Sequence, residues 1–278
     1  MGTVVTVQVV SPETDVAAAL HRALGWFAVV EAAASRFDPN SELRRLVERV
    51  GEPVAVSPVL FEALRFALAL AELTDGAFDP TVGRALQARG FDQHHVTGRR
   101  DPAADLDPDA SWRDVELDEA ARTVTLGRRL LLDLGAVAKG FAIDLAAREL
   151  SGFAGAMVEA GGDLHAAGVN ADGQPWQIGV QDPFDPDGIA DVLVIENAAV
   201  CTSGTYEKGQ HLVTAYPDTF ASVSVVAPTA MVADGLATAA FVLGPEAGPR
   251  LLEEQGVAGL FITASGERRS TGDLRRPS

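Results

Sequence analysis

The pattern of hydrophobic and polar positions predicts a mixture of strands and helices along the chain. β-Branched residues fill 3–10, which indicates a strand. Ser11-Pro12 has the form of an N-cap followed by proline at the first helical position, and the helix after it carries an apolar stripe at Leu20, Leu24 and Phe27. The pattern therefore predicts a strand followed by a helix in the amino-terminal part of the chain.

The same start signal recurs at Ser57-Pro58. An apolar stripe at Leu60, Leu64 and Leu68 predicts a second helix, and this helix is expected to end near Asp75-Gly76. The further expected elements are a loop at 97–110, a hairpin at 115–126, a strand at 130–134, a helix at 135–150, strands at 192–200 and 222–227, a helix at 234–243 and a strand at 260–263.

Strands and helices do not alternate regularly, which favours an α+β fold with mixed, mainly antiparallel sheets over a doubly wound sheet. We expect a single domain over 1–264 and a polar, frayed tail over 265–278.

The composition changes this picture in three respects. The net charge of −17 over 278 residues opposes nonspecific binding to nucleic acid or anionic membranes. An anionic ligand therefore requires a local positive charge, such as a metal ion or a lysine. The single cysteine, Cys201, excludes an internal disulfide and a cysteine-rich metal site. No apolar stretch is long enough to span a bilayer and no signal segment precedes 3–10, so we expect a cytoplasmic protein, with a trimmed export signal as the alternative.

The most informative motif is Val-Ala-Asp-Gly-Leu-Ala-Thr at 232–238, which begins an apolar run. In a helix, Asp234 and Thr238 lie on one face one turn apart. A carboxylate and a hydroxyl in this arrangement are hard oxygen donors of the kind that Mg²⁺ prefers. The alternative is a helix cap and a packed hydroxyl.

A second motif, Asp-Leu-Gly-Ala-Val-Ala-Lys-Gly at 133–140, joins the strand expected at 130–134 to a helix. The free N–H groups at such a junction, with the charge of Lys139, suit a phosphate or a ring carbonyl. A plain turn with a surface lysine is the alternative.

Two glycine-containing turns follow strands. Gly162 and Asp163 end the turn Glu-Ala-Gly-Gly-Asp at 159–163, which is suited to a flat ligand, and Ser203 lies in Cys-Thr-Ser-Gly at 201–204, which is suited to phosphate or ribose. Tight turns without a ligand are the alternatives. His211 follows and is a candidate general base.

Two further loops contain an aromatic residue among polar ones. Phe37 lies in Ser-Arg-Phe-Asp-Pro-Asn-Ser-Glu-Leu at 35–43, where it is suited either to stacking on a flat ring or to a place in the core. Gly-Ala-Phe-Asp-Pro at 76–80 ends the second helix and is also consistent with a C-cap and turn.

Taken together and in this order, the motifs resemble those of the ApbE family of FAD:protein FMN transferases. The resemblance runs through nearly the whole chain and rests on Met-Gly-Thr at 1–3, the segments at 35–43, 76–83 and 133–140, Gly-Gly-Asp at 161–163, Thr-Ser-Gly at 202–204 and Ala-Asp-Gly-Leu-Ala-Thr-Ala at 233–239. It implies an ApbE-like, T-fold-related architecture.

The resemblance also implies an activity: magnesium-dependent transfer of FMN from FAD to a Thr or Ser hydroxyl of an acceptor protein, with release of AMP. It implies catalytic roles for His211 and Asp234. The metal ligands would be the Ala136 carbonyl, Asp234 and Thr238. The cofactor-binding residues would be Met1, Phe37, Ala77, Phe78, Asp79, Asp133, Lys139, Gly162, Asp163, Ser203, His211 and Leu212.

The chain departs from the family pattern after His211, because Thr214 stands where an Asp is expected. It also begins at Met-Gly-Thr, without the lipoprotein leader of many relatives. Two alternatives to the transferase therefore remain: a magnesium-dependent hydrolase that splits FAD into FMN and AMP, and an FAD-binding protein without turnover.

Overall fold

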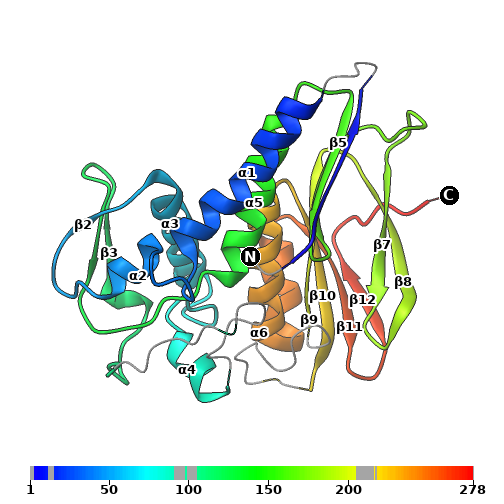
Figure 1. Ribbon diagram of the computed structural model, residues 1–278. Coiled ribbons are helices and arrows are strands. Elements are labelled where there is room, and N and C mark those ends of the chain that lie inside the picture. The colour runs from blue at the N-terminus through cyan, green and yellow to red at the C-terminus, as the bar shows by residue number, and fades with distance from the viewer. Residues whose placement is uncertain are drawn as a thin grey trace. The chain divides into compact units, whose positions relative to one another are not determined.

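The computed structural model describes residues 3–11, 16–90, 98, 105–204, 216 and 218–277. The chain divides into two compact units, one made mainly of residues 28–138 and the other of residues 3–27 and 139–278. The boundaries of this division fall within helix α1 (Ala17–Ala34) and within helix α5 (Gly135–Glu149), both of which are labelled in Figure 1. The two units subdivide the range that the sequence analysis treats as one domain.

The first unit combines short helices with a small sheet. Strands β2, β4 and β3 form a three-stranded antiparallel sheet in that order, which confirms the hairpin predicted at 115–126. The elements lying wholly in this unit are α2 (Glu42–Val47), β2 (Val54–Ala55), α3 (Pro58–Leu73), α4 (Gly83–Ala88), the 3₁₀ helix η1 (Trp112–Asp114), β3 (Val115–Asp118) and β4 (Thr123–Leu126).

Helix α3 has the boundaries that its caps predict. The Ser57 hydroxyl accepts a hydrogen bond from the backbone N–H of Leu60, and Pro58 takes the first helical position. Leu60 and Leu64 on its apolar stripe are fully buried. The chain then turns at Gly76, whose φ of 79° lies in the left-handed region that glycine adopts without strain.

The second unit contains a seven-stranded sheet with the order β1-β5-β6-β9-β10-β11-β12, in which every neighbouring pair is antiparallel. A separate ribbon pairs β7 with β8. The elements lying wholly in this unit are β1 (Val5–Val10), β5 (Gly155–Ala160), β6 (Asp163–Gly168), β7 (Trp176–Asp182), β8 (Asp185–Ile195), β9 (Ala198–Gly204), β10 (Phe220–Ala227), α6 (Ala230–Glu254), β11 (Ala258–Thr263) and β12 (Arg268–Thr271).

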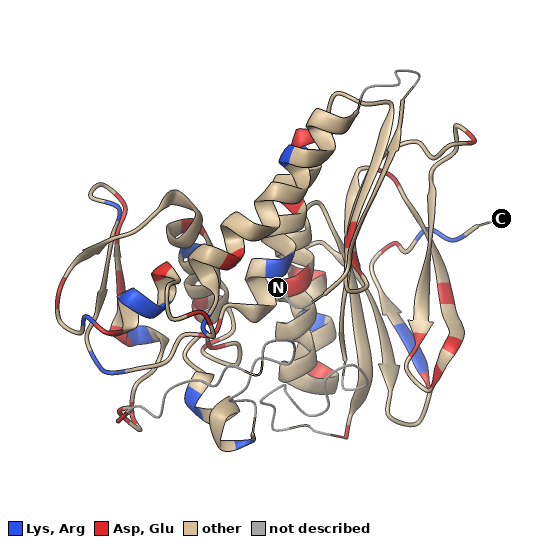
Figure 2. Cartoon of the chain, viewed as in Figure 1, with Lys and Arg blue, Asp and Glu red and all other residues tan. Residues whose placement is uncertain are grey.

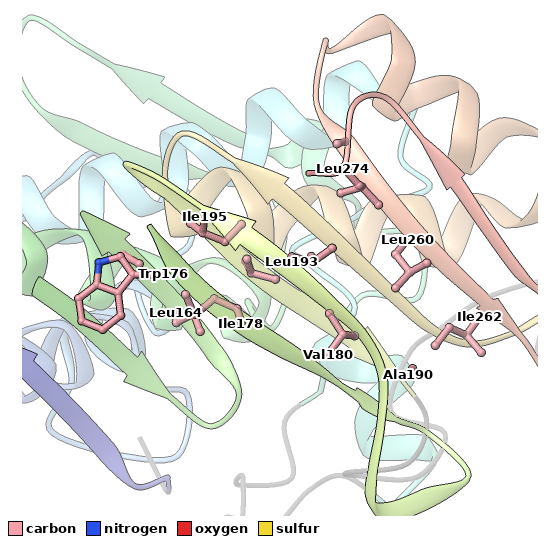
Figure 3. Packing of buried hydrophobic residues seen from close by; sticks show 13 residues of the cluster. Leu164, Trp176, Ile178, Val180, Ala190, Leu193, Ile195, Leu260, Ile262 and Leu274 are labelled. Atoms are coloured by element: carbon pink, nitrogen blue, oxygen red, sulfur yellow. The ribbon is translucent and has the colours of Figure 1, made fainter. Parts of the chain in front are cut away.

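The large sheet is covered on both faces. Helix α6 packs against β9 and β10, where Cys201 and Ser203 contact it. Alternate strand residues face the opposite side, and there side chains of β6, β9 and β11 form an apolar cluster with the ribbon (Figure 3). Trp176, Ile178 and Val180 are the inward-facing residues of β7 in this cluster. These pairings confirm the α+β class with mainly antiparallel sheets.

Three boundary predictions are wrong. Helix α1 begins at Ala17 and not at Ser11-Pro12, of which Pro12 lies outside the described residues. The range 130–134 is not a strand: its leucines are buried, but the N–H of Asp133 donates to the carbonyl of Pro80 rather than to a neighbouring strand. A short apolar run cannot by itself distinguish a paired strand from a buried loop.

The third wrong boundary is the single strand predicted at 192–200. Strand β8 ends at Ile195 and β9 begins at Ala198, with Asn197 between them at a φ of 53°. Asparagine tolerates this left-handed conformation, so the chain turns here from the ribbon into the large sheet. The helix at 234–243 and the strands at 222–227 and 260–263 are confirmed as parts of α6, β10 and β11.

The tail is more ordered than its polarity predicts. Arg268–Thr271 form β12, which pairs with β11, and Leu274 is buried in the apolar cluster beneath the ribbon. The guanidinium of Arg276 forms an ion pair with Asp191. The expectation of a frayed tail is therefore wrong for this segment, because its few apolar and backbone groups have partners elsewhere in the unit.

Among the described residues, no helix combines the length and the apolar character that a bilayer-spanning segment requires.

Candidate functional site

The first turns of α6 carry the predicted carboxylate and hydroxyl pair. The helix begins after Thr229, whose hydroxyl accepts a hydrogen bond from the N–H of Val232. Asp234 and Thr238 therefore lie inside the helix, one turn apart, and both are more than nine-tenths buried. Because Thr229 is the N-cap, the alternative in which Asp234 caps the helix is wrong.

Lys139 connects two buried carboxylates. Its ammonium forms an ion pair with Asp163 and lies 3.4 Å from Oδ2 of Asp234. The three residues come from α5, β6 and α6, so the fold brings together side chains that are far apart in the sequence. One positive charge faces two negative ones, and the cluster can therefore accept a further cation.

The glycine turn positions Asp163 within this cluster. Gly161 and Gly162 both have positive φ values and form the two-residue loop between β5 and β6. The tight turn expected at 159–163 is therefore present, and ligand binding by this turn stays a prediction. The turn places Asp163 at the start of β6, where the Oδ1 atom accepts a hydrogen bond from the N–H of Thr202 at 2.9 Å.

Strand β9 positions the hydroxyl of Thr238. Ser203 Oγ lies 2.9 Å from Thr238 Oγ1, and both side chains are buried. Ser203 was predicted to bind the cofactor, and the structure places it against a predicted metal ligand instead of in an isolated turn. Its direct contact with a cofactor stays a prediction.

The donor chemistry of this cluster fits Mg²⁺. Among the described residues, none donates a hydrogen bond to the buried Oδ2 atom of Asp234. Its charged neighbour is the Lys139 ammonium at 3.4 Å, and a hard cation would satisfy the coordination capacity that this long contact leaves. The described part of the chain has no cluster of three or more His, Cys, Asp or Glu side chains able to hold a metal, so any such site would draw on hydroxyl or backbone oxygens as well.

A second group of predicted residues lies in the first unit around Asp133. Its Oδ2 atom forms an ion pair with Nε of Arg36 at 2.8 Å, and its Oδ1 atom accepts a hydrogen bond from the N–H of Gly135 at 2.7 Å. The guanidinium of Arg36 stacks 4.3 Å from the ring centre of Phe37, which is half-buried. Asp133 therefore anchors the start of α5 and is linked to the loop that contains Phe37.

The segment after α3 is held by threonine hydroxyls. Phe78 is buried, and its N–H donates to Thr74 Oγ1 at 3.1 Å. The Asp79 carboxylate accepts hydrogen bonds from both the N–H and the hydroxyl of Thr81 at 2.7 Å. Ala77, between Thr74 and Phe78, is half-buried, and its N–H donates to the carbonyl of Thr74.

The remaining predicted residues are not tested by these contacts. Met1, His211 and Leu212 lie outside the described residues. Ala136 lies in the first turn of α5, in the first unit, whereas Asp234 and Thr238 lie in the second. The complete metal-ligand set stays a prediction.

Three residues that lie beside the predicted site residues were not singled out from the sequence: Arg36, Asp144 and His165. Arg36 lies in a motif from which only Phe37 was singled out. Asp144 of α5 is buried, His165 of β6 is half-buried, and the two interact electrostatically. Burial raises the pKa of Asp144 above 3.8 and lowers the pKa of His165 below 6.5. A lone acidic residue within the apolar run at 141–146 was the available signal for Asp144.

Fold and site together define an α+β protein in which the half-buried Lys139 lies beside buried carboxylates and hydroxyls on β6, β9 and α6. The family model described as the ApbE family matches residues 1–261. The chain belongs to the ApbE family and is an enzyme.

Similar proteins cover most of the chain. The FAD:protein FMN transferase of Haemophilus influenzae is 32% identical over 84% of this chain and 75% of the relative. That of Treponema pallidum is 34% identical over 94% of this chain and 82% of the relative. The ApbE protein of Thermotoga maritima has a TM-score of 0.84 at 29% identity, covering 97% of this chain and 94% of that chain.

Proposed function

We propose that this enzyme transfers FMN from FAD to a Thr or Ser hydroxyl of an acceptor protein in a magnesium-dependent reaction that releases AMP. The observation that carries the proposal is the buried Asp234 carboxylate, which lies one turn from Thr238 and beside Lys139. The relatives named FAD:protein FMN transferase support the flavin chemistry.

Asp234, Thr238 and the Ala136 carbonyl would hold the cation. When bound, Mg²⁺ neutralises charge on the diphosphate and on the leaving phosphate. Lys139 is held by Asp163 and adds a fixed positive charge to the cluster. In a chain with a net charge of −17, such local charge is needed to hold an anionic substrate.

The other predicted residues serve binding and proton transfer. Phe37 offers an aromatic face, and Asp133 and Gly162 lie at the turns that precede α5 and β6. The remaining predicted flavin contacts are Met1, Ala77, Phe78, Asp79, Ser203 and Leu212. In the transfer step, the acceptor oxygen forms a bond to the FMN phosphorus and the bond from that phosphorus to the bridging oxygen breaks. AMP leaves with the bridging oxygen, and His211 is the candidate acceptor for the hydroxyl proton.

A second candidate function follows from Thr214, which replaces the Asp expected after His211. With this change, water can take the place of the acceptor hydroxyl, and FAD would be split into FMN and AMP. The same residues would hold the diphosphate in both reactions.

The test combines FAD, Mg²⁺ and a candidate flavin-acceptor domain, with and without a chelator. AMP is measured by chromatography and covalent flavin by intact mass. AMP release that the chelator abolishes, together with a labelled acceptor, supports the transferase, whereas AMP with free FMN and no label supports the hydrolase. FAD binding without any AMP would reject both reactions in favour of a binding protein.

Asp234→Asn tests the metal assignment within this assay. We expect AMP release to fall by at least about 100-fold, the scale for removing one group that stabilises transition-state charge, while FAD binding changes only a few-fold. Glu246→Gln, an exposed substitution on the same helix, is the matched control and should leave the rate unchanged. Wild-type turnover in the Asp234 variant would reject the assignment.

A further inference from the structure

Asp144 of α5 completes the start of another helix. Its Oδ1 atom accepts a hydrogen bond from the N–H of Ala230 at 2.7 Å, and its Oδ2 atom accepts one from the N–H of Met231 at 2.9 Å. These are the first two residues of α6, whose N–H groups have no partner within their own helix. A carboxylate at this position also interacts favourably with the helix dipole.

The two helices meet closely at the same point. A Cβ atom added to Gly140 of α5 would lie 2.3 Å from the carbonyl oxygen of Ala230, so only glycine allows this approach. The buried Cys201 thiol of β9 donates to the same oxygen at 3.4 Å. Burial raises the pKa of Cys201 well above its usual value, so the thiol keeps the proton that it donates. Both backbone polar groups of Ala230 are therefore held from outside α6.

This junction lies next to the functional cluster. Asp234 follows Ala230 by one turn of α6, and Lys139 precedes Gly140 in α5. The Lys139 ammonium lies 3.4 Å from Asp234 Oδ2, so the same two helices are linked both by Asp144 and by this pair. A change in how α6 begins would therefore move Asp234 relative to Lys139.

We propose that Asp144 is a positioning residue that anchors the start of α6 to α5 and thereby holds Asp234 and Thr238 in place for the cation. This proposal rests on the proposed function, because it assumes that the side-chain oxygens of Asp234 and Thr238 bind the cation. It predicts that Asp144 affects cation use more strongly than it affects FAD binding.

Asp144→Asn is the test, because the amide keeps the size and one acceptor oxygen but places a donor against one of the two N–H groups. Outer-shell residues of this kind typically change metal affinity by about 10- to 100-fold. We expect the Mg²⁺ concentration for half-maximal AMP release to rise about 10-fold. FAD affinity, measured by fluorescence titration without metal, should stay within about 2-fold, because the hydrogen bonds of Asp144 within the described part of the chain go to Ala230 and Met231 and not to a predicted flavin ligand. Amide hydrogen exchange in peptides covering 230–238 should accelerate.

Thr229→Ala is the matched control, since it removes the N-cap hydroxyl of the same helix but leaves the bonds from Asp144. We expect a lower melting temperature and an unchanged Mg²⁺ requirement. Equal shifts in the two variants would overturn the proposal, because the effect would then be general helix destabilisation. An Asp144→Asn enzyme with a wild-type Mg²⁺ requirement would also overturn it.

The exchange measurement separates this inference from the proposed function. If the wild-type protein released no AMP with FAD and Mg²⁺, the proposed function would fail, and exchange at 230–238 would decide the anchoring by itself. Wild-type exchange in the Asp144→Asn variant would then overturn the anchor, and acceleration confined to this variant would support it.

Discussion

At the residue scale, the second unit buries several charged or titratable groups close to its functional cluster. Lys139 lies between Asp163 and Asp234, and Asp144 interacts with His165. Buried charges require partners, and each of these carboxylates has a cation or a backbone N–H beside it. His165 differs, because burial disfavours its charged form and lowers its pKa, while Asp144 acts in the opposite direction.

This shift predicts a pH dependence of stability. The pKa of His165 is lower in the folded state than the 6.5 of the unfolded chain, so below that pH the unfolded state takes up a proton that the folded state does not. The contribution of His165 to the free energy of unfolding should therefore fall as the pH decreases below 6.5. His165→Gln should flatten this slope, as measured by urea unfolding at several pH values.

His21→Gln provides the comparison, because His21 is exposed on α1. The free energy of unfolding of the His21→Gln variant should depend on pH as steeply as that of the wild-type protein. If His165→Gln also kept the wild-type slope, the assigned cause of acid destabilisation would be wrong.

At the element scale, pairing decides which segments are ordered. Strand β12 is polar and its first three residues are exposed, yet it pairs with β11 and is followed by the buried Leu274. Likewise, the N–H of Val194 in β8 donates to the carbonyl of Arg275. The carboxyl-terminal segment thus stabilises the ribbon and the sheet edge together.

Leu274→Ala tests this contribution. Removing a buried leucine side chain should lower the free energy of unfolding by about 2–3 kcal/mol, measured by urea denaturation. Leu24→Ala is the control, because Leu24 is 46% exposed and its loss should change stability by about 0.5 kcal/mol or less. If both variants lowered the free energy of unfolding by the same amount, Leu274 would contribute no more to stability than an exposed side chain.

At the scale of the whole molecule, acidic residues dominate. The chain carries 39 acidic and 22 basic residues, and acidic side chains occur on elements of both units (Figure 2). The resulting negative potential repels an anionic substrate at long range, although local charges such as Lys139 hold it at short range. This combination has a kinetic consequence for FAD.

In the absence of Mg²⁺, the association rate of FAD should increase with ionic strength, because salt screens the repulsion. We expect a rise of roughly 2- to 5-fold between 10 and 200 mM NaCl, measured by stopped-flow fluorescence. Riboflavin, which has no phosphate, should associate at a rate that does not change. A rate for FAD that falls with salt would show that local positive charge dominates its approach.

Local spacing explains what could be predicted. The Ser57 cap, the helix after Pro58 and the one-turn separation of Asp234 and Thr238 depend on neighbours a few residues apart, and the structure confirms them. The errors at 130–134 and 192–200 have the opposite origin. An apolar run indicates that a segment is buried. It does not indicate whether the backbone of that segment pairs with a strand, because the pairing groups lie elsewhere in the chain.

The sequence by itself determined the family, the α+β class and the identity of most candidate site residues, because ordered motifs and local periodicity are properties of the chain alone. Only the tertiary structure decided that Lys139 bridges Asp163 and Asp234, that Ser203 contacts Thr238 and that Asp144 anchors Ala230 across 86 positions. The physical reason is that each of these contacts joins separate elements, and their proximity depends on sheet order and helix packing.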